Sequence, residues 1–332
     1  MIMDNKAVDK ISIALCTRNG EAYLEQQLQS IGAQSLLPDE LVICDDASTD
    51  STVKLIKHFA STSSFSINLI QNQEQLGVVK NFSKALSCCR GDYLALCDQD
   101  NIWLPEKLKT DFDLIRKTET TLGKSFPLLV HSDLKNIDHS GLLRSSSFMK
   151  LRHIKHVSKD PLRRLLAQNF VTGCTVMVNR PLIELALPIP HTAVMHDWWL
   201  ALVAAACGKI IFNENTAILF RQHQNNVIGA RSFFSANSLS RLTNFPALEK
   251  ELAATLIQAG ELAARLKKLP AFSCPPYLEE YLASARRGGI NTARLARREA
   301  IGKTGRLRNL IFLLILTKKG YLRQVAQKSN HW

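Results

Sequence analysis

Residues 92–101 of the chain read DYLALCDQDN. Its first part, 92–97, is a short apolar run that is typical of a buried strand. Two carboxylates, Asp98 and Asp100, follow this strand with a single residue between them. A buried strand that ends in two acids predicts a polar site at the end of that strand.

Two earlier runs end in the same way. KISIALC at 10–16 is followed by Thr17, Arg18 and Asn19, and ELVIC at 40–44 is followed by Asp45 and Asp46. Patterns with helical spacing lie between these runs. We predict strands at residues 10–16, 40–44, 66–71, 92–97 and 128–131.

Strands that alternate with helices predict an α/β fold, with a mainly parallel sheet flanked by helices on both faces. Ligands bind beyond the carboxyl ends of the strands in such sheets. The polar residues after the first, second and fourth strands therefore collect at one edge. Further along, we expect strands at 170–179 and 217–220, an apolar helix at 197–207, and helices from about residue 236.

Length and charge divide the chain unevenly. The 332 residues fit one domain at 8–232 and a helical, basic C-terminal extension at 233–332. Of the formal net charge of +13, the segment from Arg286 carries +11, with twelve Lys and Arg against Glu299, which leaves +2 for the remainder. The apolar run Leu310–Leu316 in this tail suits an interfacial helix on an anionic membrane surface. A solvated basic helix folded on the body is the alternative.

The N-terminus and the cysteines predict a cytoplasmic protein. MIMDNKAVDK lacks the apolar stretch of a secretory signal, and no apolar run approaches the roughly 20 residues of a membrane span. The eight cysteines show no zinc-binding spacing. Cys16, Cys44 and Cys97 lie within apolar runs, so we expect them to be buried and reduced.

The acid pairs suggest metal and nucleotide chemistry. Asp98 and Asp100 would repel each other when ionised, and Mg²⁺ or Mn²⁺ with substrate phosphates removes that penalty. Alternatively, Asp100 caps the next helix. A helix cap at Ser48 or Thr49 does not require two adjacent acids before it. Asp45 or Asp46 is therefore a candidate to accept a hydrogen bond from a base N–H or a ribose hydroxyl. No glycine-rich phosphate loop is present.

A second group of candidates lies at HDWW, residues 196–199. Asp197 is either a helix cap or a functional carboxylate. Trp198 and Trp199 are either core residues or aromatic faces for a sugar. His223, after a predicted strand, is either structural or a further metal ligand.

The ordered motifs resemble family 2 glycosyltransferases of the GT-A fold over about residues 8–232. HDWWLAL and FRQHQNNVIGA look most like the rhamnosyltransferase-like subgroup, which builds O-antigen and other bacterial surface polysaccharides from dTDP-L-rhamnose. The remaining motifs that carry the resemblance are KISIALCTRNGEAYLEQQLQSI, ELVICDDASTDST, NQEQLGVVKNFSKAL, GDYLALCDQDNIW, Gly173-Cys174-Thr175 and MHDWWLALVAAACGKIIF.

The resemblance implies a role for each matching position. The nucleotide is expected at Thr17, Arg18, Asp45, Asp46, Asn81 and Asp98. The metal is expected at Asp98, Asp100 and His223, with Asp197 as general base and Gly173, Trp198 and Trp199 near the acceptor and sugar. The sequence departs from the family at Ala47, where Asp-Gly-Ser is usual. Because alanine requires no positive φ, we expect this departure to change little.

The expected function is inverting transfer of a sugar, L-rhamnose by this resemblance, from a nucleotide-sugar donor to a polysaccharide or lipid-linked glycan. Asp197 would take the acceptor's proton. Alternatives are a family 2 enzyme with another donor, such as UDP-galactose, UDP-N-acetylglucosamine or a different dTDP-sugar, and a sugar nucleotidyltransferase. The low charge of the body argues against nucleic acid as a partner.

Overall fold

The computed structural model describes residues 9–223 and 244–318. The chain forms two compact units. The first comprises residues up to Leu134 with Gly173–Pro188 and Ile211–Phe220, and the second comprises Lys135–Thr172, Ile189–Ile210 and the chain from Arg221. The predicted domain boundary at 232/233 lies outside the described residues.

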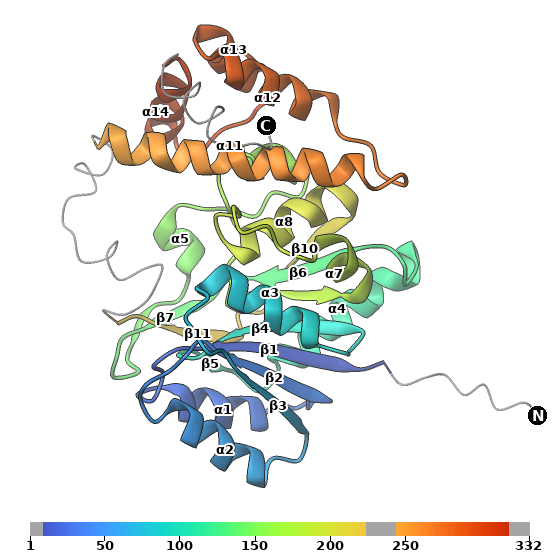
Figure 1. Cartoon of the computed structure of the whole chain (residues 1–332), viewed down its shortest axis with the longest axis vertical. Coiled ribbons are helices and arrows are strands. Elements are labelled where there is room, and N and C mark those ends of the chain that lie inside the picture. Colours follow the sequence, from blue (N-terminus) through green and yellow to red (C-terminus); the bar gives the residue numbers. More distant parts are fainter. Residues whose placement is uncertain (1–8, 224–243, 319–332) are drawn as a thin grey trace, which may run out of the picture. The chain divides into compact units, whose positions relative to one another are not determined.

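A mixed sheet forms the centre of the first unit, with strand order β10-β6-β9-β4-β1-β2-β3 (Figure 1). The pairs β1–β2, β1–β4 and β2–β3 are parallel, as predicted, whereas β9 is antiparallel to both β4 and β6. The strands are β1 (Ile11–Thr17), β2 (Glu40–Asp45), β3 (Ser66–Gln71), β4 (Tyr93–Asp98), β6 (Leu128–Ser132), β9 (Met177–Asn179) and β10 (Lys209–Asn213).

Helices cover both faces of the parallel strands. Figure 1 shows α1 (Leu24–Gly32) and α2 (Thr52–Thr62) on one face and α3 (Val78–Cys88) on the other. The chain moves from β1 to β3 in one direction and returns past them to β4. Right-handed crossovers therefore put α3 opposite the first two helices. Helices α4 (Lys107–Leu122) and α7 (Arg180–Ala186) pack near β6 and β9, and β5 (Ile102–Trp103) pairs with β11 (Ile218–Arg221).

The side chains between these layers are fully buried, which explains why the strands read as continuous apolar runs. Cys44 and Cys97 belong to this core, as predicted, but Cys16 is only partly buried. All eight cysteines are free thiols. Core residues from three strands with no exposed surface are Ile13, Leu15, Leu41, Ile43 and Leu94.

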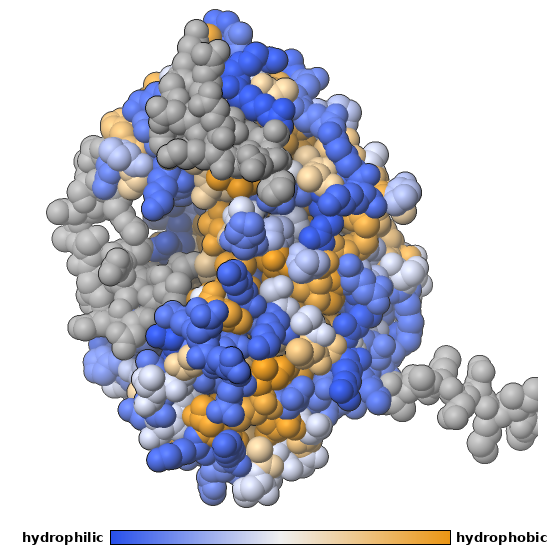
Figure 2. All heavy atoms as spheres, viewed as in Figure 1, coloured by the Kyte–Doolittle hydropathy of each residue, from blue (hydrophilic) through white to orange (hydrophobic). Residues whose placement is uncertain are grey.

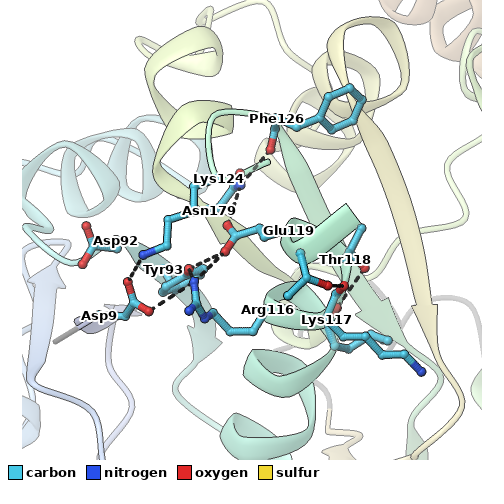
Figure 3. A network of polar contacts seen from close by, with 12 residues as sticks. Asp9, Asp92, Tyr93, Arg116, Lys117, Thr118, Glu119, Lys124, Phe126 and Asn179 are labelled. Atoms are coloured by element: carbon cyan, nitrogen blue, oxygen red, sulfur yellow. Dashed lines mark hydrogen bonds and ion pairs between the residues drawn. The ribbon is translucent and has the colours of Figure 1, made fainter. Parts of the chain in front are cut away.

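A polar network fixes the amino end of β4, at the far end of that strand from Asp98 (Figure 3). The Tyr93 hydroxyl donates a hydrogen bond of 2.6 Å to Glu119 on α4, and Arg116 reaches the same carboxylate at 3.1 Å. Asn179 on β9 donates to the other oxygen of Glu119 at 3.2 Å. Burial and the Glu119 carboxylate raise the pKa of Tyr93. This network joins β4, α4 and β9 at the amino end of β4, away from the carboxyl edge of the sheet.

One predicted strand is much shorter in the structure. Residues 170–179 were expected to be extended, but Gly173–Thr175 form a 3₁₀ turn and only Met177–Asn179 form a strand. The Val176 amide closes this turn by donating to Gly173 O at 3.0 Å. A single turn and a three-residue antiparallel strand therefore replace the long strand.

The C-terminal helices belong to the second unit with residues 135–172. Arg163 on α6 (Pro161–Leu165) donates to Glu299 at 2.5 Å, and the Thr304 amide donates to Gln168 at 2.6 Å. None of the helices among the described residues combines the length and apolar character that a membrane span needs. The other elements are β7 (Lys135–Ile137), β8 (Leu143–Ser145), α5 (Phe148–Arg152), α8 (His196–Cys207), α11 (Phe245–Lys267), α12 (Pro276–Arg287), α13 (Ile290–Arg298) and α14 (Arg306–Leu316).

Candidate active site

The parallel register of the first unit aligns the polar ends of its strands. Thr17 lies opposite Asp45, and Cys16 lies opposite Asp98. Asp45 in turn lies opposite Gln71, the last residue of β3. The loops that follow β1, β2, β3 and β4 therefore leave the sheet at one edge, where ligands bind in open α/β sheets.

Asp45 acts as a fixed support within this edge. Its side chain is buried and accepts hydrogen bonds from the Thr17 hydroxyl at 2.8 Å and from the amide and hydroxyl of Ser48 at 2.9 and 2.5 Å. Ser48 therefore holds the turn after β2 and does not cap α2, which begins at Thr52. The predicted cap at Ser48 or Thr49 is wrong because Asp45 binds the Ser48 hydroxyl and the helix starts later.

Asp46 orders the segment that leads into α3. Its carboxylate accepts hydrogen bonds from the Leu76 amide at 2.7 Å, the Gly77 amide at 2.9 Å and the Asn72 side chain at 3.1 Å. The residue is buried, so these charge-assisted bonds compensate for its desolvation. An ionised carboxylate has about four acceptor positions, so Asp46 retains capacity for a ligand donor.

Asn72 and Asn81 extend this network to the end of β3. Asn81 donates to Cys44 O at 2.8 Å and accepts from Asn72 at 2.8 Å, while Lys84 donates to Asn72 at 2.8 Å. The sequence interpretation placed Asn81 here but missed Asn72. Asn72 follows β3 directly, so the strand-end rule, applied to the third strand as well, would have found it.

The loop after β1 is more accessible than its neighbours. Arg18 is exposed, and its guanidinium donates to the main-chain oxygen of Asp46 at 2.8 Å. The Asn19 side chain accepts a hydrogen bond of 2.9 Å from the Thr49 amide. Arg18 therefore presents a cation beside the carboxylates at the end of β2, which suits an anionic ligand.

Ala47 differs from its expected conformation. Its φ is 58°, in the left-handed region that favours glycine. The expectation that alanine needs no positive φ here is wrong, because the turn that brings Ser48 back onto Asp45 requires that conformation. A left-handed alanine costs about 1–2 kcal/mol, and the buried hydrogen bonds on both sides hold it in place.

Asp98 is the last residue of β4, and Asp100 lies in the turn that follows. Asp100 is buried and does not cap a helix, because α4 begins at Lys107. The pKa values of the Cys97 and Cys174 thiols are raised by burial and, secondarily, by these two carboxylates. Asp98 itself is partly exposed, whereas Asp100 is buried, so the pair lies between the core and the accessible edge of the sheet.

The described residues contain no group of three or more His, Cys, Asp or Glu side chains arranged to hold a metal ion. The metal set of Asp98, Asp100 and His223 therefore stays a prediction. Asp98 and Asp100 belong to the first unit, whereas His223 follows β11 in the second. Two carboxylates alone suit a Mg²⁺ ion that takes its other ligands from water and substrate phosphates.

Asp197 lies in the first turn of α8 and not at its N-cap, which is Met195. It is 8% exposed, and its Oδ1 accepts hydrogen bonds from the Trp198 amide at 2.6 Å and from Asn169 at 3.3 Å. The amino end of a helix stabilises an ionised carboxylate. Sequence reasoning missed Asn169, since no local pattern links it to a residue so far along the chain.

The two tryptophans lie in the core of the second unit. Trp199 is fully buried with Arg265 5.5 Å from its ring, and the Trp198 indole donates to Leu165 O at 2.8 Å. These positions favour the core role that the sequence also allowed, and sugar binding remains a prediction. Gly173, also predicted near the acceptor, is buried in the 3₁₀ turn of the first unit.

Comparison with known proteins agrees with this geometry. Residues 12–176 match the sequence model of Glycosyl transferase family 2. An uncharacterized protein of Mycobacterium tuberculosis is 31% identical over 221 residues, which cover 65% of this chain and 60% of that protein. The chain thus spans about three fifths of the length of such relatives. The dTDP-rhamnosyl transferase RfbG of Shigella flexneri is 26% identical over 235 residues, or 67% of this chain and 76% of that protein.

The fold has solved counterparts. The structure of S. aureus TarS 1–349 in complex with UDP-GlcNAc superposes with a TM-score of 0.55 over 96% of this chain and 90% of that one, at 16% sequence identity. Identity this low shows the shared fold alone. The chain thus has the GT-A fold, and its residues 12–176 are similar to family 2 glycosyltransferases.

Proposed function

We propose that this protein is an inverting, metal-dependent glycosyltransferase that moves a sugar from a nucleotide diphosphate to a glycan acceptor. One observation carries the proposal. Asp98 and the hydrogen-bonded pair of Thr17 and Asp45 lie at the same carboxyl edge of the sheet, in a segment that matches family 2 glycosyltransferases. Arg18 and Asp46 would bind the nucleotide at this edge. Asn81 and Asn72 would keep Asp46 in place.

Asp98 and Asp100 would hold Mg²⁺ or Mn²⁺ together with the donor diphosphate. When bound, the cation supplies positive charge that stabilises the leaving nucleoside diphosphate. The residue types fit such an ion, because two carboxylates with one residue between them, one of them buried, would repel each other less with a cation bound. His223 would add a further ligand.

Asp197 would act as general base. It takes the proton from an acceptor hydroxyl while that oxygen bonds to the anomeric carbon and the bond from this carbon to the diphosphate oxygen breaks. One displacement inverts the anomeric configuration, so a β-linked L-rhamnose donor gives an α-rhamnoside. Asn169 and the Trp198 amide orient the carboxylate, and the amino end of α8 favours its ionised form.

The donor that we propose is dTDP-L-rhamnose, and the acceptor is a surface polysaccharide or a lipid-linked precursor of one, such as O-antigen. The similarity to the dTDP-rhamnosyl transferase RfbG supports this choice. A UDP-sugar is the second candidate. An Escherichia coli protein named for UDP-Glc as donor is 23% identical over 57% of this chain, and the TarS structure contains UDP-GlcNAc.

A donor panel tests the proposal. The protein would be incubated with dTDP-L-rhamnose, UDP-glucose, UDP-galactose and UDP-N-acetylglucosamine, with Mg²⁺, Mn²⁺ or EDTA, and release of nucleoside diphosphate would be measured. We expect metal-dependent release from dTDP-L-rhamnose, abolished in Asp98→Ala. Release from a UDP-sugar alone would show that this sugar nucleotide, and not dTDP-L-rhamnose, is the donor. If no donor gave metal-dependent release, the proposed activity would be refuted.

We also propose a peripheral position on the cytoplasmic face of the membrane. Leu307, Leu310 and Leu314 follow helical spacing on one face of α14 and are 56%, 54% and 50% exposed, with exposed Arg306 and Arg308 beside them. Figure 2 shows that hydrophobic residues reach the described surface of one face of the molecule among hydrophilic ones. Exposed leucines flanked by cations suit the interface of an anionic bilayer.

Vesicle binding by point variants tests the proposed membrane position and keeps every helix in the protein. Truncation before α13 would break the contact of Arg163 with Glu299, so point substitutions are better. Changing the three α14 leucines to Gln should weaken binding to vesicles containing phosphatidylglycerol at least about 10-fold. The matched control replaces Leu142 and Leu143, which are 58% and 53% exposed in the second unit. Equal loss in both variants, or none in either, would exclude the α14 face.

A further inference from the structure

Gln99, between the two aspartates, makes a specific contact with the loop after β1. Its Oε1 accepts a hydrogen bond of 2.8 Å from the Arg18 amide, and its Nε2 donates one of 3.0 Å to Arg18 O. One side-chain amide thus satisfies both main-chain polar groups of Arg18. The last paired residues of β1 and β4 are Cys16 and Asp98, so Gln99 adds two bonds just beyond the end of the ladder.

Gly20 provides the space for this amide. A Cβ atom at Gly20 would lie 2.4 Å from Oε1 and 2.7 Å from Cδ of Gln99, and its three nearest atoms would all belong to that side chain. No side chain larger than hydrogen fits without moving Gln99. Gln99, in the turn after β4, therefore bonds to the loop after β1 at Arg18 and packs closely against it at Gly20.

Hydrogen bonds hold the loop after β1 on both sides. Gln99 attaches it to the end of β4, while the Arg18 guanidinium and the Asn19 amide attach it to Asp46 O and to the Ser48 hydroxyl after β2. Arg18 and Asn19 are exposed, so burial contributes little to ordering them. The position of Arg18 relative to the aspartates consequently depends on the Gln99 amide.

We infer that Gln99 is a positioning residue that fixes the spacing between the nucleotide-binding loop at Arg18 and the diphosphate- and metal-binding pair Asp98 and Asp100. This inference rests on the proposed function. A nucleoside diphosphate would contact both regions, and a preset spacing lets both contacts form without ordering the loop during binding. Gln99 therefore couples nucleotide binding to metal binding.

Calorimetry with dTDP and UDP, in the presence and absence of Mg²⁺, tests the coupling. Gln99→Met keeps the length of the side chain but removes both hydrogen bonds. We expect the Mg²⁺-induced gain in nucleotide affinity to fall about 10-fold, within the usual range of coupling between sites. The melting temperature should change by no more than a few degrees. The matched control is Gln29→Met, an exposed amide on α1, which should leave both quantities unchanged.

A double-mutant cycle separates positioning from general damage. Gly20→Ala should reproduce the loss, because the new methyl group displaces the Gln99 amide. In a Gln99→Ala background the same substitution should cost little, because the atoms that it would strike are gone. An unchanged Mg²⁺ effect in Gln99→Met, or equal costs of Gly20→Ala in both backgrounds, would overturn the inference. Failure of the unmodified protein to bind either nucleotide would overturn the proposed function itself and the inference with it.

Discussion

The Asp46 carboxylate accepts a hydrogen bond of 2.9 Å from the main-chain amide of Gly77, 31 residues further along the chain. Asp46 thereby links the end of β2 to the start of α3, whose N-cap is Gly77. A residue that the sequence marks for nucleotide binding is thus also a structural support. Loss of activity in an Asp46 variant would not by itself distinguish these roles, whereas its effect on stability would.

Asp46→Asn should lower the free energy of unfolding by about 2–3 kcal/mol. The buried carboxylate, which accepts several hydrogen bonds, is replaced by an amide in which one of the two acceptor oxygens becomes an NH₂ donor. That NH₂ group would face either the Leu76 amide or the Gly77 amide. Urea unfolding checks the change. Asp113→Asn, at an exposed ion pair with Lys109, should leave the midpoint unchanged. Similar midpoints for both variants would contradict the structural role.

Ala47→Gly should raise the free energy of unfolding by up to about 1.5 kcal/mol. Glycine relieves the left-handed strain, worth about 1–2 kcal/mol, but gives the unfolded chain more freedom, worth about 0.4–1 kcal/mol. Ala60→Gly, in the exposed part of α2, should have the opposite sign and cost about 1 kcal/mol. Destabilisation by both substitutions would show that Ala47 is not strained.

Asp98→Ala and Asp100→Ala should abolish metal-dependent donor binding and transfer while the fold is retained. His223→Ala should weaken the metal dependence less severely. Titration of donor binding with Mn²⁺ measures these effects, and an unchanged titration in both aspartate variants would remove the metal assignment.

Asp197→Asn should reduce transfer by about 100- to 10,000-fold, the usual cost of losing a general base, with nearly normal donor and metal binding. The variant keeps the oxygen that accepts from the Trp198 amide and Asn169, so its stability should change little. Steady-state kinetics with a working acceptor gives the comparison. If most of the turnover survives, Asp197 only stabilises the start of α8.

His196 should make the protein sensitive to acid. Burial lowers the pKa of this histidine to about 3, below the ordinary value of 6.5. Below pH 6.5 the unfolded chain takes up a proton that the folded chain does not, so stability falls as the pH decreases toward 3. The slope is at most about 1.4 kcal/mol per pH unit, or about 2 kcal/mol between pH 7 and 5.

His196→Phe should remove this part of the acid sensitivity and keep the aromatic volume. Urea unfolding at pH 7 and pH 5 gives the difference for each protein. The exposed His58 on α2 provides the control, and His58→Phe should retain the full pH dependence of the parent. Parallel losses for the parent and the His196 variant would show that other groups cause the acid sensitivity.

The sequence by itself determined the parallel part of the sheet and the placement of its polar edge. Apolar runs of strand length before Thr17, Asp45 and Asp98 are local signals, and parallel pairing brings their ends to one edge whatever the rest of the chain does. The ordered motifs also identified the family that residues 12–176 match. These properties need only short-range patterns and a general rule of topology.

Tertiary structure decided which hydrogen bonds these residues make. Asp46 is held by Leu76 and Gly77, Asp197 by Asn169, and Arg18 by Gln99, and each of the partners Leu76, Asn169 and Gln99 is at least 28 residues away along the chain. The antiparallel β9 and the buried Trp199 depend in the same way on distant segments. Side-chain periodicity records which face of an element is buried, but it carries no information about which distant group will meet it. For that reason the sequence could mark the site, whereas only the folded chain could separate its supports from its candidate ligands.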